Sequence, residues 1–170
     1  RCLDPSNPGL RKNLLLSATA ALHVFIQNYP MSSFHLESQR FAIGTSKEQN
    51  SIIIIYDLRT ATKWRILDGH RGDMTAIAFN PNGNILVSYS ANEIPIPTVR
   101  VWNTAVSGFF SSLLGIQGRC TKVWKLPPIE KKEKEQIKQQ KLLQVSLTWQ
   151  TNQSFTLIRE DLHHYNFGIE

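Results

Sequence analysis

The sequence predicts an all-β protein built from repeated units of four short strands and preceded by one helix. Short runs of β-branched and aromatic residues alternate with turn residues over most of 31–170, as in sandwiches, barrels and propellers. A strand-rich unit also repeats, because Tyr56-Asp57 and Trp102-Asn103 end equivalent runs that lie 46 residues apart. A period of about 40 to 45 residues is typical of propellers with four-stranded blades. The sequence therefore favours β-propeller blades.

Residues 1–30 are interpreted as a separate helical segment before the blades. Asn7 can cap a helix over 7–29, Pro8 suits its first turn, and Pro30 ends it. One face of this helix carries an apolar stripe of Leu10, Leu14, Ala18, Ala21, Leu22, Phe25 and Ile26. Such a stripe has to pack against another part of the protein.

The domain over 31–170 contains eleven predicted strands. They cover residues 32–36, 40–44, 52–58, 63–67, 74–79, 85–90, 98–102, 119–126, 143–149, 154–159 and 164–169. This corresponds to about two full blades and a terminal partial one, with a polar low-complexity loop at 130–141. A ring needs about four to eight blades. Further blades are therefore expected from preceding sequence.

The stretch 67–83 is the strongest local signal, because it links one unit to the next. Its final residues, Asn80-Pro81-Asn82-Gly83, predict the turn of a β-hairpin. Pro81 presets its own φ, and either Asn82 or Gly83 accepts a positive φ. We expect a tight connection between two strands here.

Within this stretch, Gly69-His70-Arg71-Gly72-Asp73 resembles the passage between blades in WD-repeat proteins. The resemblance implies a buried hydrogen-bond network in which His70 joins the hydroxyl of Ser88 and the indole of Trp102. The family's network also uses an aspartate in the turn between the last two. That turn reads Asn92-Glu93-Ile94-Pro95 here, so the network is expected to be incomplete or rebuilt.

The chain also resembles the C-terminal propeller of rabconnectin beta subunits over nearly its whole length. The resemblance is carried by Cys2-Leu3-Asp4-Pro5, Arg40-Phe41-Ala42-Ile43-Gly44, Tyr56-Asp57-Leu58-Arg59-Thr60, Gly69-His70-Arg71-Gly72, the stretch 75–83, Arg119-Cys120-Thr121-Lys122 with Pro127-Pro128, and Leu147-Thr148-Trp149. It implies a DMX-like rabconnectin alpha subunit and vacuolar-type ATPase subunits as partners. It also implies a role in proton pump assembly and vesicle acidification. The expected location is cytoplasmic, peripheral to endosomal, vacuolar or vesicle membranes through those partners.

Motifs for catalysis and for cofactors are missing from the sequence. It contains no phosphate-binding, dinucleotide-binding, nucleophile-elbow or zinc-protease pattern. The segment 160–164 holds His163 and His164, but adjacent strand residues point to opposite faces. The sequence therefore predicts a non-enzymatic protein-interaction scaffold with no metal, cofactor or small-molecule substrate.

Partner contacts are predicted on the loops between strands, because loops carry much of the binding by rigid scaffolds. The candidate partner residues are Lys47, Glu48, Arg71, Asp73, Asn92 and Glu93. One alternative is a generic WD-repeat scaffold of another trafficking or cytoskeletal complex. Another is a basic nucleic-acid-binding module, because the net charge is +6. The basic residues are not interleaved with stacking aromatics, which argues against nucleic acid.

Overall fold

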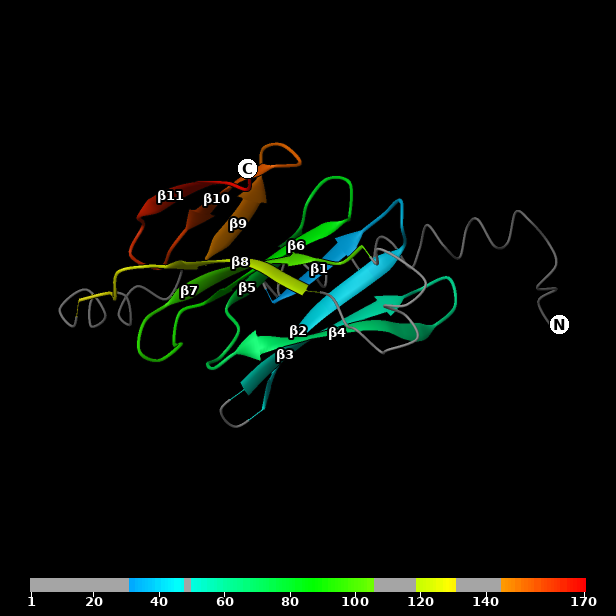
Figure 1. The fold of residues 1–170 in the computed structure, drawn as a ribbon, viewed down its shortest axis with the longest axis horizontal. Helices are drawn as coiled ribbons and strands as arrows, with labels where there is room; N and C mark the ends of the chain where they lie inside the picture. Colours follow the sequence, from blue (N-terminus) through cyan, green and yellow to red (C-terminus); the bar gives the residue numbers. More distant parts are fainter. Residues whose placement is uncertain (1–30, 48–49, 106–118, 131–144) are drawn as a thin grey trace, which may run out of the picture.

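The computed structural model describes residues 31–47, 50–105, 119–130 and 145–170 (Figure 1). The predicted helix at 7–29 and residues 131–141 of the predicted polar loop lie outside this part of the chain. The described residues form eleven β-strands, and each overlaps one of the eleven predicted runs. They are β1 (Ser32–His35), β2 (Arg40–Lys47), β3 (Asn50–Asp57), β4 (Thr62–His70), β5 (Ala76–Phe79), β6 (Ile85–Ser90), β7 (Thr98–Asn103), β8 (Arg119–Lys125), β9 (Ser146–Trp149), β10 (Ser154–Ile158) and β11 (His164–Gly168).

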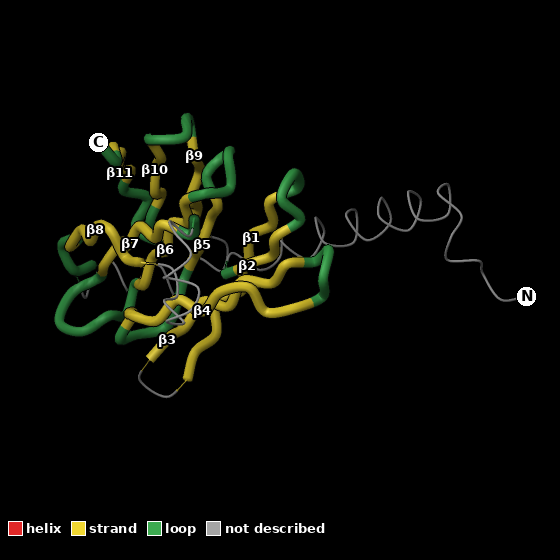
Figure 2. The backbone as a smooth tube through the Cα atoms, turned by 45° about the vertical axis from the view of Figure 1, so that its right-hand side comes forward, coloured by secondary structure: helices red, strands yellow, loops and turns green. Residues whose placement is uncertain are grey.

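The strands form three sheets, which we call the first, second and third blade. The first blade has the strand order β1-β2-β3-β4, the second β5-β6-β7-β8 and the third β9-β10-β11. Neighbouring strands in each blade are antiparallel and consecutive in sequence. Strand β5 contacts both β1 and β9, so the three leading strands lie side by side (Figure 2). The blades therefore pack face to face around their leading strands.

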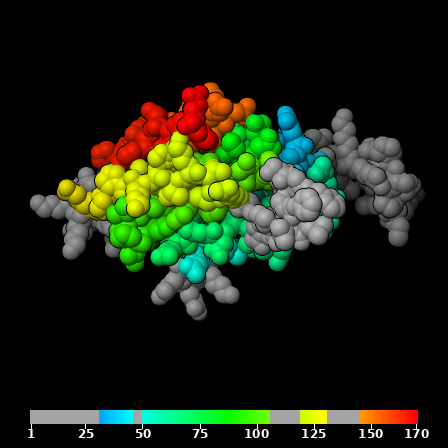
Figure 3. All heavy atoms as spheres, viewed as in Figure 1, coloured from blue at the N-terminus to red at the C-terminus, as the bar shows by residue number. Residues whose placement is uncertain are grey.

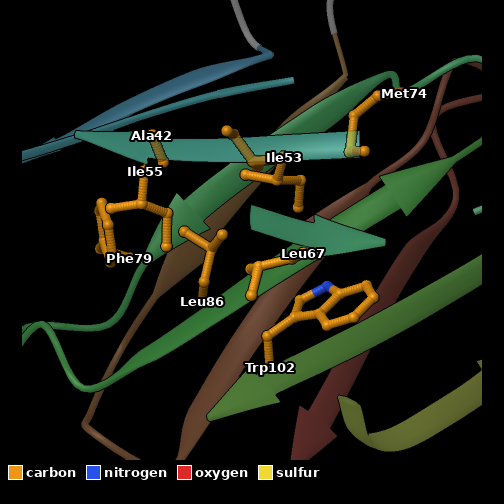
Figure 4. Packing of buried hydrophobic residues seen from close by; sticks show 9 residues of the cluster. Ala42, Ile53, Ile55, Leu67, Met74, Phe79, Leu86 and Trp102 are labelled. Carbon is orange, nitrogen blue, oxygen red and sulfur yellow. The ribbon is translucent and has the colours of Figure 1, made fainter. Parts of the chain in front are cut away.

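A hydrophobic core joins the first and second blades. The first blade contributes Ala42, Ile53, Ile55 and Leu67, and the second contributes Met74, Ile77, Phe79, Leu86 and Trp102 (Figure 4). The β3 pattern explains the selection, because alternate residues of an isoleucine run point to this core. Full burial of one such side chain stabilises the fold by about 1.5 to 3 kcal/mol.

A second core joins the second and third blades. It consists of Ala76, Val87, Tyr89, Val99, Val101, Leu126, Val145, Phe155 and Leu157. In β6, Leu86 faces the first blade while Val87 and Tyr89 face the third. The second blade is thus covered on both faces, which explains why β6 is buried along nearly its whole length.

At one end of the strands, the hairpin turns of neighbouring blades form hydrogen bonds with one another. The Nε2 atom of His35 lies 2.8 Å from the carbonyl oxygen of Pro81, and the amide nitrogen of Asn82 donates to Oδ1 of Asn152 at 2.9 Å. Gly83 adopts the positive φ of the 80–83 turn, at 73°. A Cβ atom there would lie 2.5 Å from the His35 ring, so the turn needs glycine for both conformation and space.

Candidate functional site

The structure brings His70, Ser88 and Trp102 together in the interior between the first two blades. His70 ends β4 of the first blade, whereas Ser88 and Trp102 lie in β6 and β7 of the second. The Trp102 Nε1 atom lies 2.8 Å from the Ser88 hydroxyl, which lies 2.6 Å from Nε2 of His70. All three side chains are buried. Long-range packing therefore assembles the predicted trio from three strands.

The donors and acceptors determine the protonation state of this trio. An indole nitrogen can only donate, so the Ser88 oxygen accepts from Trp102 and uses its own hydrogen toward Nε2 of His70. The Nδ1–H of His70 is then free to donate to Oε2 of Glu93, 2.6 Å away. Burial lowers the pKa of His70, and the Glu93 hydrogen bond opposes this only in part. His70 is therefore the neutral member of the network.

Glu93 occupies the position that the family's aspartate would fill. Its carboxylate accepts from His70, from the Thr98 hydroxyl and from Nη2 of Arg100 at 2.7 Å. Burial alone would raise the pKa of Glu93, but the hydrogen bonds from these three donors lower it to about 2. Glu93 is consequently an ionised carboxylate that is satisfied by a fixed set of donors.

Two expectations about this turn are settled by Glu93. The network is rebuilt and is not incomplete, because the longer glutamate side chain reaches His70 from the altered loop. The prediction of Glu93 as a partner-surface residue is wrong, since only 6% of the residue is exposed. A buried carboxylate has to be paired, and the network supplies that pairing. The acidic residue in the turn between β6 and β7 was the sequence signal for this role.

Gly69, next to His70, has a packing role in this network. A Cβ atom at this position would lie 2.9 Å from Cη2 of Trp102. The indole ring therefore lies directly against the β4 backbone. This close approach explains the glycine of the Gly69-His70 pair.

A pocket of about 450 Å³ opens beside the network. Its walls are residues 68–71 at the end of β4 and residues 93–96 in the loop after β6, and Arg100, Val123 and Lys125 complete the lining with Asn50 and Thr98. The rim is apolar in part, because Ile94 is 79% exposed and Val123 is 43% exposed. Sequence reasoning missed Arg100, Val123 and Lys125 as site residues. The sequence signal for this site was β8, which carries three cationic residues and no acidic residue.

The described ranges contain no group of three or more His, Cys, Asp or Glu side chains suited to a metal ion. Within the same ranges, no helix has the length and apolar character needed to cross a membrane.

The three-blade arrangement is similar to that of solved propellers. The structure of the Dos1 propeller matches 81% of this chain and 30% of its own chain, with a TM-score of 0.56 and 10% sequence identity. The fold is that of a β-propeller. The crystal structure of Hsv2 from Kluyvelomyces marxianus matches 75% of this chain and 38% of its own, with a TM-score of 0.49 and 14% identity.

A sequence relative matches part of this propeller chain. Pre-mRNA-processing factor 19 homolog 2 from Arabidopsis thaliana is 30% identical over 87 residues. The match covers 51% of this chain and 15% of that relative, so the chain spans only a small part of the relative's length. No family model matches the sequence. The Dos1 structure supports the propeller fold alone, and membership of the WD-repeat family and the resemblance to rabconnectin beta subunits remain predictions.

The other predicted partner residues lie at different places on the propeller. Arg71 and Asp73 are exposed in the loop between β4 and β5, and Asn92 is exposed in the loop between β6 and β7. Lys47 ends β2, and Glu48 lies outside the described residues. Gly72 brings the first loop against the second, since its added Cβ would lie 2.8 Å from the Glu93 backbone. Arg71, Asp73 and Asn92 thus share one region, and their role with partners stays a prediction.

The segment 160–164 stabilises the third blade of the propeller. Asp161 forms an ion pair with the buried Arg159, whose guanidinium also donates to the Pro127 carbonyl. Burial would raise the pKa of Asp161, but the Arg159 hydrogen bonds lower it to about 2. His163 also contacts this carboxylate, with Nδ1 at 3.1 Å from Oδ2. The acidic and histidine-containing segment therefore has a structural explanation.

Proposed function

We propose that this chain is the C-terminal part of a rabconnectin-beta-like scaffold that regulates vacuolar-type proton pump assembly and vesicle acidification. The propeller fold suggests a protein-interaction scaffold, and WD-repeat propeller homologues are typically non-enzymatic. The pump-specific role rests on the sequence motifs that resemble rabconnectin beta subunits. In this proposal, residues 1–30 form a helical segment that precedes the blades over 31–170.

The scaffold function is supported best by His70, because both of its ring nitrogens form hydrogen bonds inside the fold. Nε2 accepts from Ser88 and Nδ1 donates to Glu93. The His70 ring and the Ser88 hydroxyl are both buried, and Ser88 also accepts from Trp102, so neither group is placed to exchange a proton with a substrate. The network instead immobilises the loops on both sides of the pocket. Rigid loops on a packed scaffold suit protein recognition.

The proposed partners are a DMX-like alpha subunit and subunits of the vacuolar-type ATPase. The proposed location is cytoplasmic, on endosomal, vacuolar or vesicle membranes through these partners. Support comes from the motif resemblance along the chain and from exposed loops that can contact proteins. A generic WD-repeat scaffold of another trafficking or cytoskeletal complex is the second candidate, because the sequence relative supports only the broader family.

The test is affinity purification of the intact protein from detergent-solubilised cells, followed by mass spectrometry. Recovery of a DMX-like protein together with pump subunits is the expected result. Recovery of a different protein complex without either would contradict the pump role and favour the second candidate. Nuclease treatment separates direct protein contacts from bridging by nucleic acid. Loss of all captured proteins after nuclease would contradict both candidate scaffold functions.

A further inference from the structure

We propose that the pocket beside β8 binds an extended acidic segment of a partner protein, with one apolar side chain between its acidic residues. This inference rests on the proposed scaffold function and names the site and the chemistry of the segment. Charge, exposed apolar surface and the edge position of β8 support this site.

Positive charge dominates the groups of the pocket that remain available. Arg71, Arg100 and Lys125 line it, together with the two acids Asp68 and Glu93. Glu93 is already held by Arg100 and by two further donors, which leaves Asp68 facing Arg71 and Lys125. Arg100 also has a buried Nε atom without a hydrogen-bond partner among the described residues. Carboxylates of a partner would complement this set.

The strand next to the pocket extends the positive surface. β8 carries Arg119, Lys122 and Lys125 and no acidic residue. Of these, Lys125 lines the pocket, whereas Lys122 lies over Trp124 and donates to the carbonyl oxygens of Gly168 and Glu170. It crosses the exposed surface between the second and third blades in the space-filling view, where residues 119–125 are yellow (Figure 3). Lysines on an edge strand also discourage aggregation. That role does not explain the exposed isoleucine beside them.

Ile94 and Val123 supply an apolar contact at the pocket rim. They are 79% and 43% exposed, and both line the pocket. Covering an exposed aliphatic side chain stabilises a complex, because apolar surface is removed from water. A segment with an apolar side chain flanked by acids matches this mixture of isoleucine, valine and cations.

The edge position of β8 gives the segment a backbone partner. Among the described residues, β8 is the outermost strand of the second blade and pairs with β7 alone. Val123 and Lys125 line the pocket, whereas Trp124 packs in the core facing the third blade. A strand added to this edge would place every second side chain over the pocket. The predicted motif is therefore acid-x-apolar-x-acid.

The pocket lining favours a peptide over a nucleic acid. Its lining contains no Phe, Tyr or Trp side chain, so a base has no ring on which to stack. Asp68 would also repel a continuous phosphate backbone, whereas a peptide can place its acids selectively. Protein is therefore the partner class to which the proposal commits.

The test measures fluorescence anisotropy of a labelled Glu-Thr-Leu-Thr-Glu peptide with the intact protein. The matched peptides Lys-Thr-Leu-Thr-Lys and Glu-Thr-Ser-Thr-Glu test the charge and the apolar residue. We expect the first control not to bind and the second to bind about tenfold more weakly, since tenfold in affinity corresponds to about 1.4 kcal/mol. Equal binding of the two charge-opposite peptides would overturn the proposal.

Protein variants locate the binding site. The double variant Arg71→Glu with Lys125→Glu should weaken the acidic peptide by at least about tenfold, and Ile94→Ser by a similar factor. Lys63→Glu makes one such charge reversal at an exposed position of β4 and should bind like the wild type. Unchanged affinity of the double variant for the acidic peptide would refute the proposed site. Stronger binding of single-stranded RNA at the same site would also refute it.

The same variants separate this proposal from the scaffold function. If the double variant keeps every protein captured by the wild type, the site is wrong and the scaffold function stands. If the wild type captures no protein at all, the scaffold function fails, whatever the peptide result.

Discussion

His70 and Glu93 form a 2.6 Å hydrogen bond between the outer strand of one blade and a loop of the next. They lie 23 residues apart in the chain, and each has a second attachment inside the protein. His70 contacts Ser88, and Glu93 contacts Arg100. The pair therefore connects β4, β6 and β7, and the stability of the first two blades should depend on it.

Replacement of Glu93 tests this connection directly. Glu93→Ala leaves the Nδ1–H of His70 and the Thr98 hydroxyl without their acceptor and Arg100 without its counter-charge. We expect the free energy of unfolding to fall by about 3 to 5 kcal/mol, as for other broken buried pairs. Chemical denaturation of the intact protein measures the change. A loss below about 0.5 kcal/mol, typical of surface substitutions, would contradict the role assigned to Glu93.

Glu93→Asp provides a sharper comparison, because aspartate is the residue that the WD-repeat resemblance expects. The carboxylate would retreat by one methylene group, and the loop of this chain places the backbone for the longer side chain. We expect Glu93→Asp to be less stable than the wild type and Glu93→Gln to be intermediate, since the amide keeps the reach but loses the charge. Melting temperatures of the three variants give the order. A melting temperature of Glu93→Asp equal to or above that of the wild type would show that the loop adjusts to the shorter side chain.

Acidification should destabilise the protein in two stages. The pKa of His70 is lowered in the folded state from an ordinary value of 6.5, so its contribution is complete above about pH 6.5 and declines below it. The pKa of Glu93 is about 2 in the fold against an ordinary 4.5. Its contribution is therefore lost as the pH falls from about 4.5 toward about 2.

Glu93→Gln should weaken the lower stage without abolishing it. The pKa values of Asp57 and Asp161 are also lowered to about 2, chiefly by hydrogen bonds from Arg59 and Arg159, respectively. Their contributions have the same sign and remain in the variant. Melting temperatures between pH 7 and pH 3 provide the measurement. A profile of Glu93→Gln identical to that of the wild type would contradict the assignment.

Removal of the Ser88 hydroxyl should cost more than an ordinary serine substitution. Ser88→Ala leaves the indole N–H of Trp102 without an acceptor and Nε2 of His70 without a donor, both in the buried interior. Each unsatisfied buried group costs about 1 to 3 kcal/mol. Ser146→Ala is the matched control, because its hydroxyl bonds Thr148 at an exposed position. Equal unfolding free energies for the two variants would argue against a stabilising network.

Gly83→Ala should weaken the contact between the first two blades. The residue has a φ of 73°, and its new methyl group would collide with the His35 ring at 2.5 Å. We expect a loss of at least about 1 kcal/mol from backbone strain, with the collision adding to it. Gly168→Ala is the control, since nothing lies within 4 Å of its added Cβ. Similar denaturation midpoints for both variants would disprove the role of Gly83.

Much of the local structure follows from sequence patterns. Alternating apolar residues located the strands, because a strand exposes successive side chains to opposite faces. In the turn between β5 and β6, Gly83 and not Asn82 has the positive φ, which is the less strained of the two options for the backbone. The strand ends were less predictable. For example, β4 extends to His70, three residues beyond the expected end, because Asp68 and His70 continue the pairing with β3.

The sequence by itself determined the strands and the repeat, because these depend on short-range periodicity, and the resemblance to WD-repeat proteins supplied the expectation of the trio of His70, Ser88 and Trp102. Only the tertiary structure decided the role of Glu93 and the lining of the pocket. Whether a glutamate in a loop is exposed or buried depends on donors from other strands, here Thr98 and Arg100. The pocket likewise forms where β4, the loop after β6, and β8 meet. Such contacts arise from packing between distant segments, which no local pattern specifies.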